Sequence, residues 1–555
     1  MNRQKLFTVL AGVIICVSAI LMLYRLANAY FWDDEAYVGF MAANFLKSGH
    51  LSCWDGRNLY VAEDGALLHR DFTQSAQFSL DIAAAIPMFK MFGVSTWAAR
   101  FPSVVYAILG LVALTALLKL EFPKKPALVL FGLGLLAFSV QYMINARTAR
   151  YYSLVSLFAI LTFYFYRRFG KSRSWRDAIG LSISAIVLFY GHLLGGLAFI
   201  VSLVIMHLIF HRREYTMQDW TKIAVAAVLF LAATVPDVVV NQLWSYGRSG
   251  HESSGLRTHL WIAWLNLRDL NITNCLPWLA VAGLVVLLTR TKGQADVDEV
   301  RPIVRDWALL TVLYAIAQGL LCAPSQVSMQ VSVLRYLGPI LPFLTSLTAI
   351  FVWLVYRMSK PVSIGLFLVI ISSNLLTLTP LPPTLAPATD MPRSLLPAYL
   401  HEITHPYTTA DEAVSKFLHA HAHHDDNVAT YPSYHATTMD FYDGDFIRTG
   451  DLLDKQCPLP VDLIHSLHAP LYIDENWPNW VVFYGPETDQ ASTLKVFSQA
   501  HVEGGKSVKY KYMLAQRLDV YWRETNRGEL TRHEFVPPPV TDPKDGVYIY
   551  RRVKE

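Results

Sequence analysis

The sequence predicts a polytopic α-helical membrane protein that ends in a smaller α/β domain. Hydrophobic residues make up 53% of the 555 residues and charged residues only 16%, and the mean hydropathy is +0.32. Soluble domains carry about 25% charged residues. Long apolar runs recur as far as residue 378, and a proline-rich stretch then separates them from a segment of ordinary soluble composition. The bilayer is therefore the solvent for most of this chain.

The apolar runs predict about eleven transmembrane helices, because about 20 apolar residues cross the hydrocarbon core. A single helix over 178–210 would be roughly 50 Å long at 1.5 Å per residue, so we expect two helices there. The pairs Gly191-His192 and Gly195-Gly196 offer the break. The predicted spans are 6–23, 99–118, 126–145, 151–166, 177–191, 193–210, 221–239, 274–289, 307–322, 337–356 and 361–378.

Basic residues predict the orientation of these spans. With two helices in 178–210, every strongly basic loop falls on one side, which the positive-inside rule places in the cytoplasm together with the N-terminus. The first run shows no convincing cleavage site and is interpreted as an uncleaved helix. We expect a bacterial cytoplasmic (inner) membrane protein with its C-terminal domain in the periplasm. The basic residues are Lys119, Lys124, Lys125, those of 167–176, Arg212, Arg213, Arg290, Lys292, Arg301, Arg305, Arg357 and Lys360.

The chain divides into a membrane module (1–379), a proline-rich linker (380–399) and an α/β domain (400–555). The first external loop, about 25–98, should contain helices at 35–46 and 78–91, since loops this long carry structure or function. Aromatic and basic residues in the external segment 242–273 suggest an interfacial helix. In the last domain we expect a helix at 410–420 and strands at 427–431, 480–484, 518–522 and 547–551.

Three consecutive acids follow the first span. Asp33, Asp34 and Glu35 stand at a membrane edge, where mutual repulsion and desolvation should raise at least one pKa. A carboxylate of this kind suits a general base. Acids also favour the N-terminus of a helix, and Asp34 is a suitable cap for one starting at Glu35. Position alone leaves both interpretations open.

Two arginine motifs lie on the predicted outer side. Arg147 and Arg150, followed by Tyr151, stand at the junction of the third and fourth spans, and residues three apart share one face of a helix. Arg335 and Tyr336 open the tenth span. The planar guanidinium fork suits a phosphate group, whereas interfacial anchoring is the simpler alternative.

Other polar residues are weaker candidates. Arg70 lies late in the first loop, Arg100 begins the second span, His192 occupies the predicted helix break, and Asp237 is an acid near the outer end of the seventh span. A lone histidine in such a break is more often a satisfied polar residue than a catalyst.

Metal and redox features are sparse in the sequence. The histidines of 419–424 resemble a metal site, but a solvated helix end explains them more simply, and we assign no metal ligand. Among five scattered cysteines, Cys53 and Cys275 fall in external segments, yet unpaired thiols are the expectation. The sequence contains no Walker-type phosphate loop, no Rossmann fingerprint and no extended basic and aromatic surface for nucleic acid.

These features together resemble the type C glycosyltransferases, specifically relatives of the protein O-mannosyltransferases and the lipid A aminoarabinose transferases. The family carries an Asp-Glu pair directly after the first membrane helix, as in Asp34-Glu35. The order of its motifs over about 1–379 is similar to the order here. The other motifs are Phe92-Gly93 followed by Arg100-Phe101-Pro102, the element Arg147–Tyr152, and the element Arg335–Pro339.

The resemblance implies a sugar donor on a polyprenyl-monophosphate carrier and inversion at the anomeric carbon. Asp34 would then act as general base on the acceptor, with Glu35 and Asp33 orienting it or tuning its pKa. Many relatives carry a basic residue or a histidine, followed by prolines, before the helix leading to Phe-Gly. This chain reads Thr-Gln-Ser-Ala-Gln at 73–77, which leaves those contacts open, and Arg70 is the candidate. The donor phosphate would be held by Arg147, Arg150, Arg335, Tyr336 and Arg70.

The expected partners are the lipid-linked donor, membrane lipids and an acceptor that is a lipid, a glycan or a protein, with no nucleic acid. No cofactor is implied with certainty, and a divalent cation stays open. A transporter or flippase of lipid-linked sugars is the alternative function, although the paired interrupted helices common in transporters are not found. A non-catalytic surface receptor is a third, less economical interpretation of the acid triplet.

Overall fold

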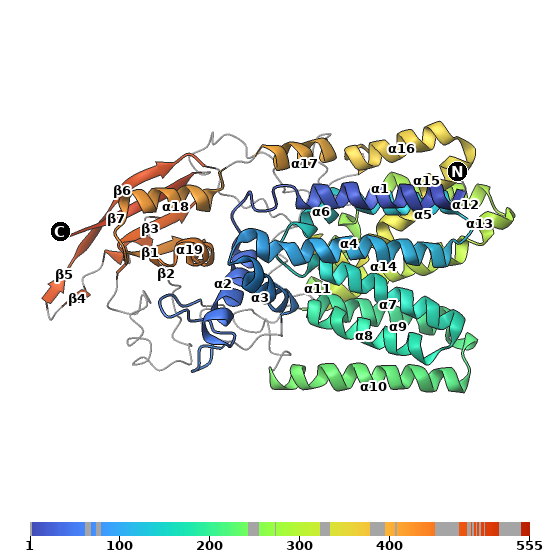
Figure 1. Ribbon diagram of the computed structural model, residues 1–555, viewed down its shortest axis with the longest axis horizontal. Coiled ribbons are helices and arrows are strands. Elements are labelled where there is room, and N and C mark those ends of the chain that lie inside the picture. Colours follow the sequence, from blue (N-terminus) through green and yellow to red (C-terminus); the bar gives the residue numbers. More distant parts are fainter. Residues whose placement is uncertain are drawn as a thin grey trace.

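The computed structural model shows a bundle of long helices with a smaller sheet domain at one end (Figure 1). The structure describes residues 3–60, 68–73, 79–241, 255–271, 273–321, 334–377, 394–405, 408–433, 435–449, 477–485, 490, 493–495, 497–498, 501–503, 506–520 and 546–554.

Each of the eleven apolar runs is largely helical. Within the described residues, six helices are long and apolar enough to cross a membrane, or seven if the pair α5 and α6, bent by 57°, counts as one span. This shows a mainly helical membrane protein, and the total of eleven spans stays a prediction. The helices are α1 (Arg3–Leu23), α4 (Thr96–Glu121), α5 (Pro126–Ala137), α6 (Val140–Ala146), α7 (Tyr152–Ser172), α8 (Trp175–Gly191), α9 (Leu193–Phe210), α10 (Met217–Val240), α12 (Trp278–Arg290), α14 (Arg301–Leu321), α15 (Leu341–Met358) and α16 (Lys360–Ser372).

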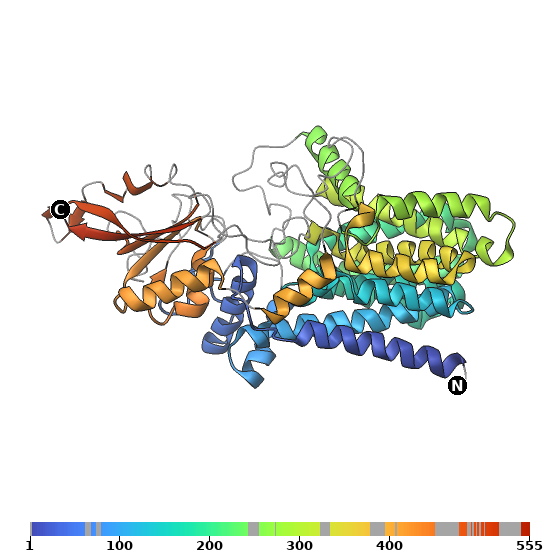
Figure 2. The same ribbon diagram turned by 90° about the horizontal axis from the view of Figure 1, so that it is seen from above.

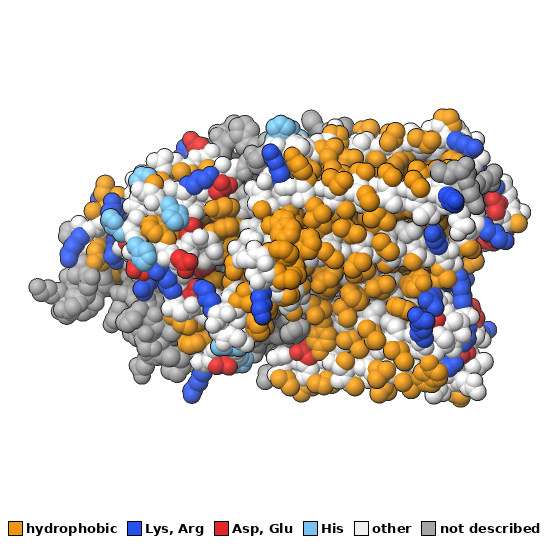
Figure 3. All heavy atoms as spheres, in the orientation of Figure 1, with side chains coloured by type: hydrophobic (Ala, Val, Ile, Leu, Met, Phe, Trp, Pro, Cys, Tyr) orange, Lys and Arg blue, Asp and Glu red, His pale blue; other side chains and the backbone are white. Residues whose placement is uncertain are grey.

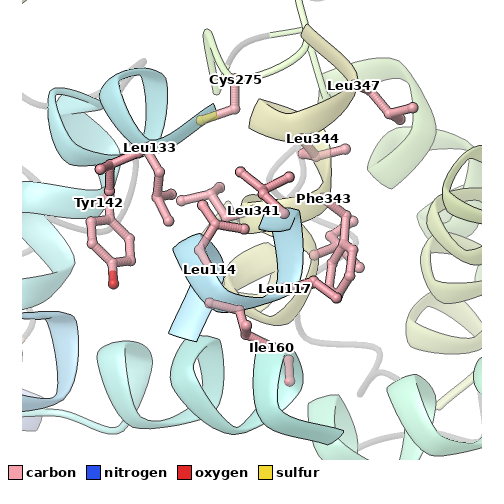
Figure 4. Packing of buried hydrophobic residues seen from close by; sticks show 14 of the residues in the cluster. Leu114, Leu117, Leu133, Tyr142, Ile160, Cys275, Leu341, Phe343, Leu344 and Leu347 are labelled. Carbon is pink, nitrogen blue, oxygen red and sulfur yellow. The ribbon is translucent and has the colours of Figure 1, made fainter. Parts of the chain in front are cut away.

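The bundle has a continuous apolar core. Leu114 and Leu117 of α4 meet Leu133 of α5, Ile160 of α7 and Phe343 of α15, all almost completely buried (Figure 4). Close packing of such side chains compensates for the absence of a hydrophobic driving force between helices in lipid. The same core therefore connects the early and late spans.

A helix break stands at His192, as predicted. This residue ends α8 and begins α9 with extended backbone (φ −160°, ψ 110°), and its Nδ1 accepts a hydrogen bond from the Gly195 amide. The side chain thus caps α9 in the way that short polar residues cap helices. The prediction of two helices within 178–210 is confirmed.

On the face of the molecule that Figure 3 shows, hydrophobic side chains form a broad band across the bundle, and lysines and arginines gather at the end remote from the sheet. This pattern is typical of a membrane protein with one basic face. Which end lies in the cytoplasm stays a prediction.

Helices α2 (Asp33–Ser48) and α3 (Leu80–Phe92) cover the opposite end of the bundle, as expected for the first loop. Helix α11 (Leu256–Asp269) lies in the second predicted external segment and packs against α14. Helix α17 (Leu395–Thr404) follows the proline-rich stretch, and its Leu395, Tyr399 and Ile403 join the core of the bundle. The chain after residue 394 thus returns to the bundle before it enters the sheet domain. Short helices complete this part: η2 (Arg212–Glu214), α13 (Ala295–Asp298), η5 (Leu334–Ile340) and η6 (Leu375–Thr377).

The sheet domain contains a five-stranded sheet of order β2-β1-β3-β7-β6, seen from a second side in Figure 2. Strands β2, β1 and β3 are parallel, and β7 and β6 add antiparallel to them. Helices α18 and α19 pack on this sheet, and β4 and β5 form a separate hairpin. The elements are α18 (Ala410–His421), β1 (Asn427–Tyr431), α19 (His435–Asp443), β2 (Arg448–Thr449), β3 (Trp480–Tyr484), β4 (His501–Glu503), β5 (Lys506–Val508), β6 (Tyr510–Leu518) and β7 (Val547–Lys554).

One strand differs from the sequence prediction, whereas the cysteines agree with it. The strand expected at 518–522 lies at Tyr510–Leu518, where it pairs with β7. Cys53 and Cys275 are not joined by a disulfide, which agrees with the expectation of unpaired thiols; both are buried, in separate apolar clusters. The Cys275 thiol instead lies 3.4 Å from the Ser139 hydroxyl in a hydrogen bond.

Candidate active site

The acids predicted to carry the chemistry lie at the N-terminus of α2, at the end of the bundle that faces the sheet domain (Figure 1). The start of α3 and the turn between α6 and α7 meet α2 here. Segments separated by more than a hundred residues are thus brought to one place by the packing of α2, α3, α4 and α7.

Glu35 and Arg100 form a buried ion pair. Arg100 Nε donates to Glu35 Oε1 and Arg100 Nη2 donates to Oε2, both at 2.8 Å. The Ala149 amide also donates to Oε1, at 2.7 Å. Both side chains are at most 1% exposed. Such a bidentate pair with a further amide donor compensates for the desolvation of both charges.

The remaining donors of Arg100 hold the connection between α1 and α2. Its Nη1 donates to the carbonyls of Leu26 and Ala29, each at 3.0 Å, and its Nη2 donates to that of Tyr30 at 3.3 Å. Together with the two bonds to Glu35, these contacts use all five N–H donors of the guanidinium. Arg100 and Glu35 are therefore anchors of the local backbone.

Asp34 points instead toward Arg150. Arg150 Nη2 lies 3.4 Å from Asp34 Oδ1, and Arg150 Nη1 lies 4.0 Å from Asp81 Oδ2. Burial lowers the pKa of Arg150, but Asp34 and Asp81 outweigh that effect and raise it well above the usual value. Asp34 is 29% exposed, so this carboxylate can meet both a cation and an incoming group.

The expected cluster of repelling carboxylates does not form between Asp34 and Glu35, because they pair with different arginines on different sides of α2. The side chain of Asp33, the first residue of α2, lies outside the described part of the chain.

Arg147 is separated from Arg150, contrary to the expectation of a shared clamp. Its Nη1 donates to the carbonyls of Met22 at 2.9 Å and Tyr24 at 2.7 Å, and its Nη2 donates to that of Arg25 at 3.0 Å. These carbonyls lie at and just beyond the C-terminus of α1, where a cation is favourable. The structure therefore gives Arg147 a capping role.

A row of side chains continues from Arg150 across the site. Arg150 Cζ lies 5.2 Å from the centre of the Tyr151 ring, which stacks on His192 at 4.4 Å. His192 stacks in turn on Tyr336 at 5.3 Å. Tyr336 belongs to η5, which also contains Arg335; the side chain of Arg335 lies outside the described part. Three predicted candidates from distant segments, Tyr151, His192 and Tyr336, are thus in contact.

Two further candidates lie apart from this row. Arg70 is exposed on a turn in which the Phe72 amide donates to the His69 carbonyl. Asp237, near the end of α10, accepts a hydrogen bond from the Asn241 side chain at 2.7 Å. Neither residue has a described contact with Asp34 or Arg150.

The histidine-rich segment of the sheet domain pairs with single acids. His419 lies 2.9 Å from Asp443, and His424 lies 2.8 Å from Asp425. Within the described ranges, histidine, cysteine and acidic side chains form no group of three or more that could hold a metal ion.

Asp81 was missed by the sequence argument. It stands in the first turn of α3, where an acid is expected for the helix dipole alone. The available signal was its position in a predicted helix of the first loop, and its proximity to Arg150 depends on tertiary packing.

Residues 83–239 match the sequence profile of the family described as dolichyl-phosphate-mannose-protein mannosyltransferase. The matched segment contains Arg100, Arg150 and His192, whereas Asp34 and Tyr336 lie outside it. The match confirms the resemblance drawn from the motifs and the predicted class of enzyme, a glycosyltransferase, and it favours an enzyme over the transporter alternative. No curated protein sequence matches the chain.

Several solved structures are similar to this chain. The crystal structure of ArnT from Cupriavidus metallidurans bound to undecaprenyl phosphate is 15% identical, with 90% of this chain and 95% of that chain covered and a TM-score of 0.49. AglB, the archaeal oligosaccharyltransferase from Archaeoglobus fulgidus, in complex with an inhibitory peptide and a dolichol-phosphate, is 9% identical, with coverages of 85% and 69% and a TM-score of 0.45. The arabinosyltransferase EmbB from Mycobacterium smegmatis is 14% identical, with coverages of 62% and 30% and a TM-score of 0.39.

Proposed function

We propose that this glycosyltransferase moves a sugar from a polyprenyl-monophosphate carrier to an acceptor hydroxyl at the outer face of the membrane. The observation that carries the proposal is the continuous row from Asp34 through Arg150, Tyr151 and His192 to Tyr336. It joins a partly exposed carboxylate to the segment that contains Arg335. This row supports the proposal that a base, Asp34, and the cations for a leaving phosphate, Arg150 and Arg335, border one site.

The proposed step is a single displacement with inversion. The acceptor oxygen forms a bond to the anomeric carbon while Asp34 takes the hydroxyl proton. The bond between this carbon and the phosphate oxygen breaks, and the phosphate leaves with the electron pair. Arg150 and Arg335 stabilise the charge that develops on the phosphate, which already is a good leaving group and needs no strong acid.

Glu35 and Arg100 have a supporting role in this proposal. Their buried pair fixes the first turn of α2, and the rigid helix then holds Asp34 at the edge of the site. Positioning of this kind accounts for a large part of enzymatic rate enhancement. Tyr336 and His192 offer ring faces and polar edges beside the donor, while Arg147 is placed outside the phosphate clamp.

The test is Asp34→Asn, assayed with a radiolabelled polyprenyl-phosphate sugar in membranes supplying the acceptor. We expect loss of transfer by about 100-fold or more, the range for removal of a general base. Asp71→Asn is the matched control, because it makes the same change on an exposed turn of the same loop. Transfer by Asp34→Asn at the rate of the control would reject the base.

The orientation is tested separately with a membrane-impermeant thiol reagent in intact cells. In a cysteine-free background, Arg70→Cys should be labelled from outside and Lys292→Cys only after the membrane is opened. The opposite pattern would place the site on the cytoplasmic side.

A further inference from the structure

Helix α19 of the sheet domain contacts the connection that leads into the acids of α2. Its Tyr442 lies against Tyr30 and Phe31, the residues just before Trp32 and the start of α2. The sheet domain, about 400 residues later in the chain, is thus in contact with the backbone that presents Asp34.

Tyr442 makes three specific contacts there. Its ring stacks on Tyr30 with 3.8 Å between ring centres and an angle of 16°. Its hydroxyl accepts a hydrogen bond from the Phe31 amide at 3.0 Å and shares one with the Thr96 hydroxyl at 2.7 Å. Burial raises the pKa of Tyr442 to about 12, so the hydroxyl stays neutral and keeps its proton for this network.

Phe31 is enclosed between this helix and the Arg100 anchor. It is 1% exposed; its ring lies 4.8 Å from Phe441 of α19 and 5.3 Å from Arg100 Cζ. On α2, Gly39 leaves the space for this packing, because a Cβ there would lie 2.7 Å from Phe441 and 2.8 Å from Phe31.

The sheet domain is held in one orientation by a second group of contacts. Asn58 donates to the Gly444 carbonyl at 3.1 Å and accepts from the Thr449 amide at 3.1 Å. Arg57 pairs with Asp425 at 2.9 Å. Two separate parts of the first loop therefore dock on the domain, which limits its rotation relative to α2.

From this geometry we infer that Tyr442 is a positioning residue for the transfer reaction, through which the sheet domain fixes the location of Asp34. The inference rests on the proposed function of Asp34. Tyr442 acts through the Phe31 amide, three residues before Asp34, and has no described contact with Asp34 itself. Loss of the hydroxyl should release the backbone before α2 and misplace the carboxylate, and an error of about 1 Å can cost about 100-fold in rate.

The experiment compares Tyr442→Phe with Tyr512→Phe in the full-length protein in nanodiscs. Both variants remove one buried hydroxyl of the sheet domain, but Tyr512 donates only within that domain, to the Pro478 carbonyl at 2.7 Å. We expect kcat to fall by about 10- to 100-fold in Tyr442→Phe. The KM for the lipid donor should stay within about twofold, and Tyr512→Phe should retain wild-type kcat. A kcat of Tyr442→Phe equal to that of the control overturns the inference.

A second measurement does not depend on turnover. Hydrogen exchange of a peptide covering residues 30–35 should become faster in Tyr442→Phe and stay protected in Tyr512→Phe. If neither the wild type nor the variants transfer sugar from the polyprenyl donor, the proposed function fails. Unchanged hydrogen exchange in Tyr442→Phe would in that case also overturn the positioning role of Tyr442. Should Tyr442→Phe not fold, Thr96→Val removes the second partner of the same hydroxyl from the side of α4. Thr96→Val should lower kcat, as expected for Tyr442→Phe, and a wild-type kcat in Thr96→Val would overturn the inference.

Discussion

The two carboxylate oxygens of Glu35 accept the Nε and Nη2 donors of Arg100 at 2.8 Å, in a position from which solvent is almost excluded. A third donor, the Ala149 amide, brings the turn between α6 and α7 to the same oxygen. Three segments that are far apart in the sequence are therefore joined by one carboxylate. The neighbouring Asp34 is turned by about 100° around the helix and faces Arg150.

This separation of roles predicts opposite phenotypes for two adjacent acids. Glu35→Gln leaves the Arg100 charge buried without its counter-ion, which typically costs about 3–5 kcal/mol. We expect a large fall in the midpoint of thermal unfolding, measured by size-exclusion fluorescence in detergent. Asp34→Asn should unfold near the wild-type temperature although it loses activity. Equal thermal losses in the two variants would contradict the assignment of Glu35 as the anchor.

The two arginines of the α6–α7 turn should also differ. Arg150→Lys keeps the charge but loses the planar fork, so we expect a fall of about 10- to 100-fold in kcat/KM for the lipid donor. Arg147→Lys loses hydrogen bonds to carbonyls at and just beyond the end of α1, each contributing about 1.5–3 kcal/mol, so it should lower stability and leave the donor KM unchanged. Kinetics and thermal unfolding of both purified variants decide this. A raised donor KM in Arg147→Lys together with wild-type stability would show that Arg147 belongs to the group of arginines that bind the donor phosphate.

The different positions of these two arginines could not be predicted from the sequence. The spacing of Arg147 and Arg150 predicts one helical face only if the helix is continuous. Helix α6 ends at Ala146 and α7 begins at Tyr152, so the two side chains diverge in the turn between them. The local sequence pattern cannot predict this divergence, because the break between α6 and α7 depends on the tertiary contacts that each guanidinium makes in the folded bundle.

Hydropathy and turn residues predicted the helices well, since the bilayer imposes span length directly. The break at His192 followed from glycines and from loop charge. The sequence indicates Tyr151, His192 and Tyr336 as separate candidates, and only the fold shows that their rings form one stack. The approach of α19 to Phe31 had no sequence signal, because it joins residues about 400 positions apart.

Gly39 gives a direct test of the packing between α2 and α19. Gly39→Ala places a methyl group against Phe441 and Phe31, and overpacking of this kind costs about 1–3 kcal/mol. Gly365→Ala in α16 is the matched control: nothing lies within 4 Å of its added carbon, so the gain in helix propensity of up to about 1 kcal/mol should dominate. Thermal unfolding should therefore move in opposite directions in the two variants. A stabilised Gly39→Ala would show that α19 does not press on α2.

The sheet domain should also show a pH-dependent stability with a defined sign. Burial raises the pKa of Asp443, and hydrogen bonds from Ser415 and His419 counteract this only in part. The folded state therefore holds this proton more tightly than the unfolded chain. Ionisation of Asp443 then opposes folding as the pH rises from the ordinary aspartate pKa of about 4 to the raised value.

Asp443→Asn should accordingly be more stable than the wild type at pH 7.5, and the difference should shrink as the pH approaches about 4. Asp425→Asn should change the stability at pH 7.5 in the opposite direction, because a hydrogen bond from His424 lowers the pKa of Asp425. That carboxylate stabilises the fold above the ordinary pKa and loses the effect on acidification. Asp425→Asn should thus be less stable at pH 7.5, and most of this deficit should persist at about pH 4 and fade only at lower pH, where Asp425 itself becomes protonated. Unfolding midpoints of both variants at the two pH values are the measurement, and a gain for Asp443→Asn that grows on acidification would show that the buried carboxyl is stabilised in its charged form.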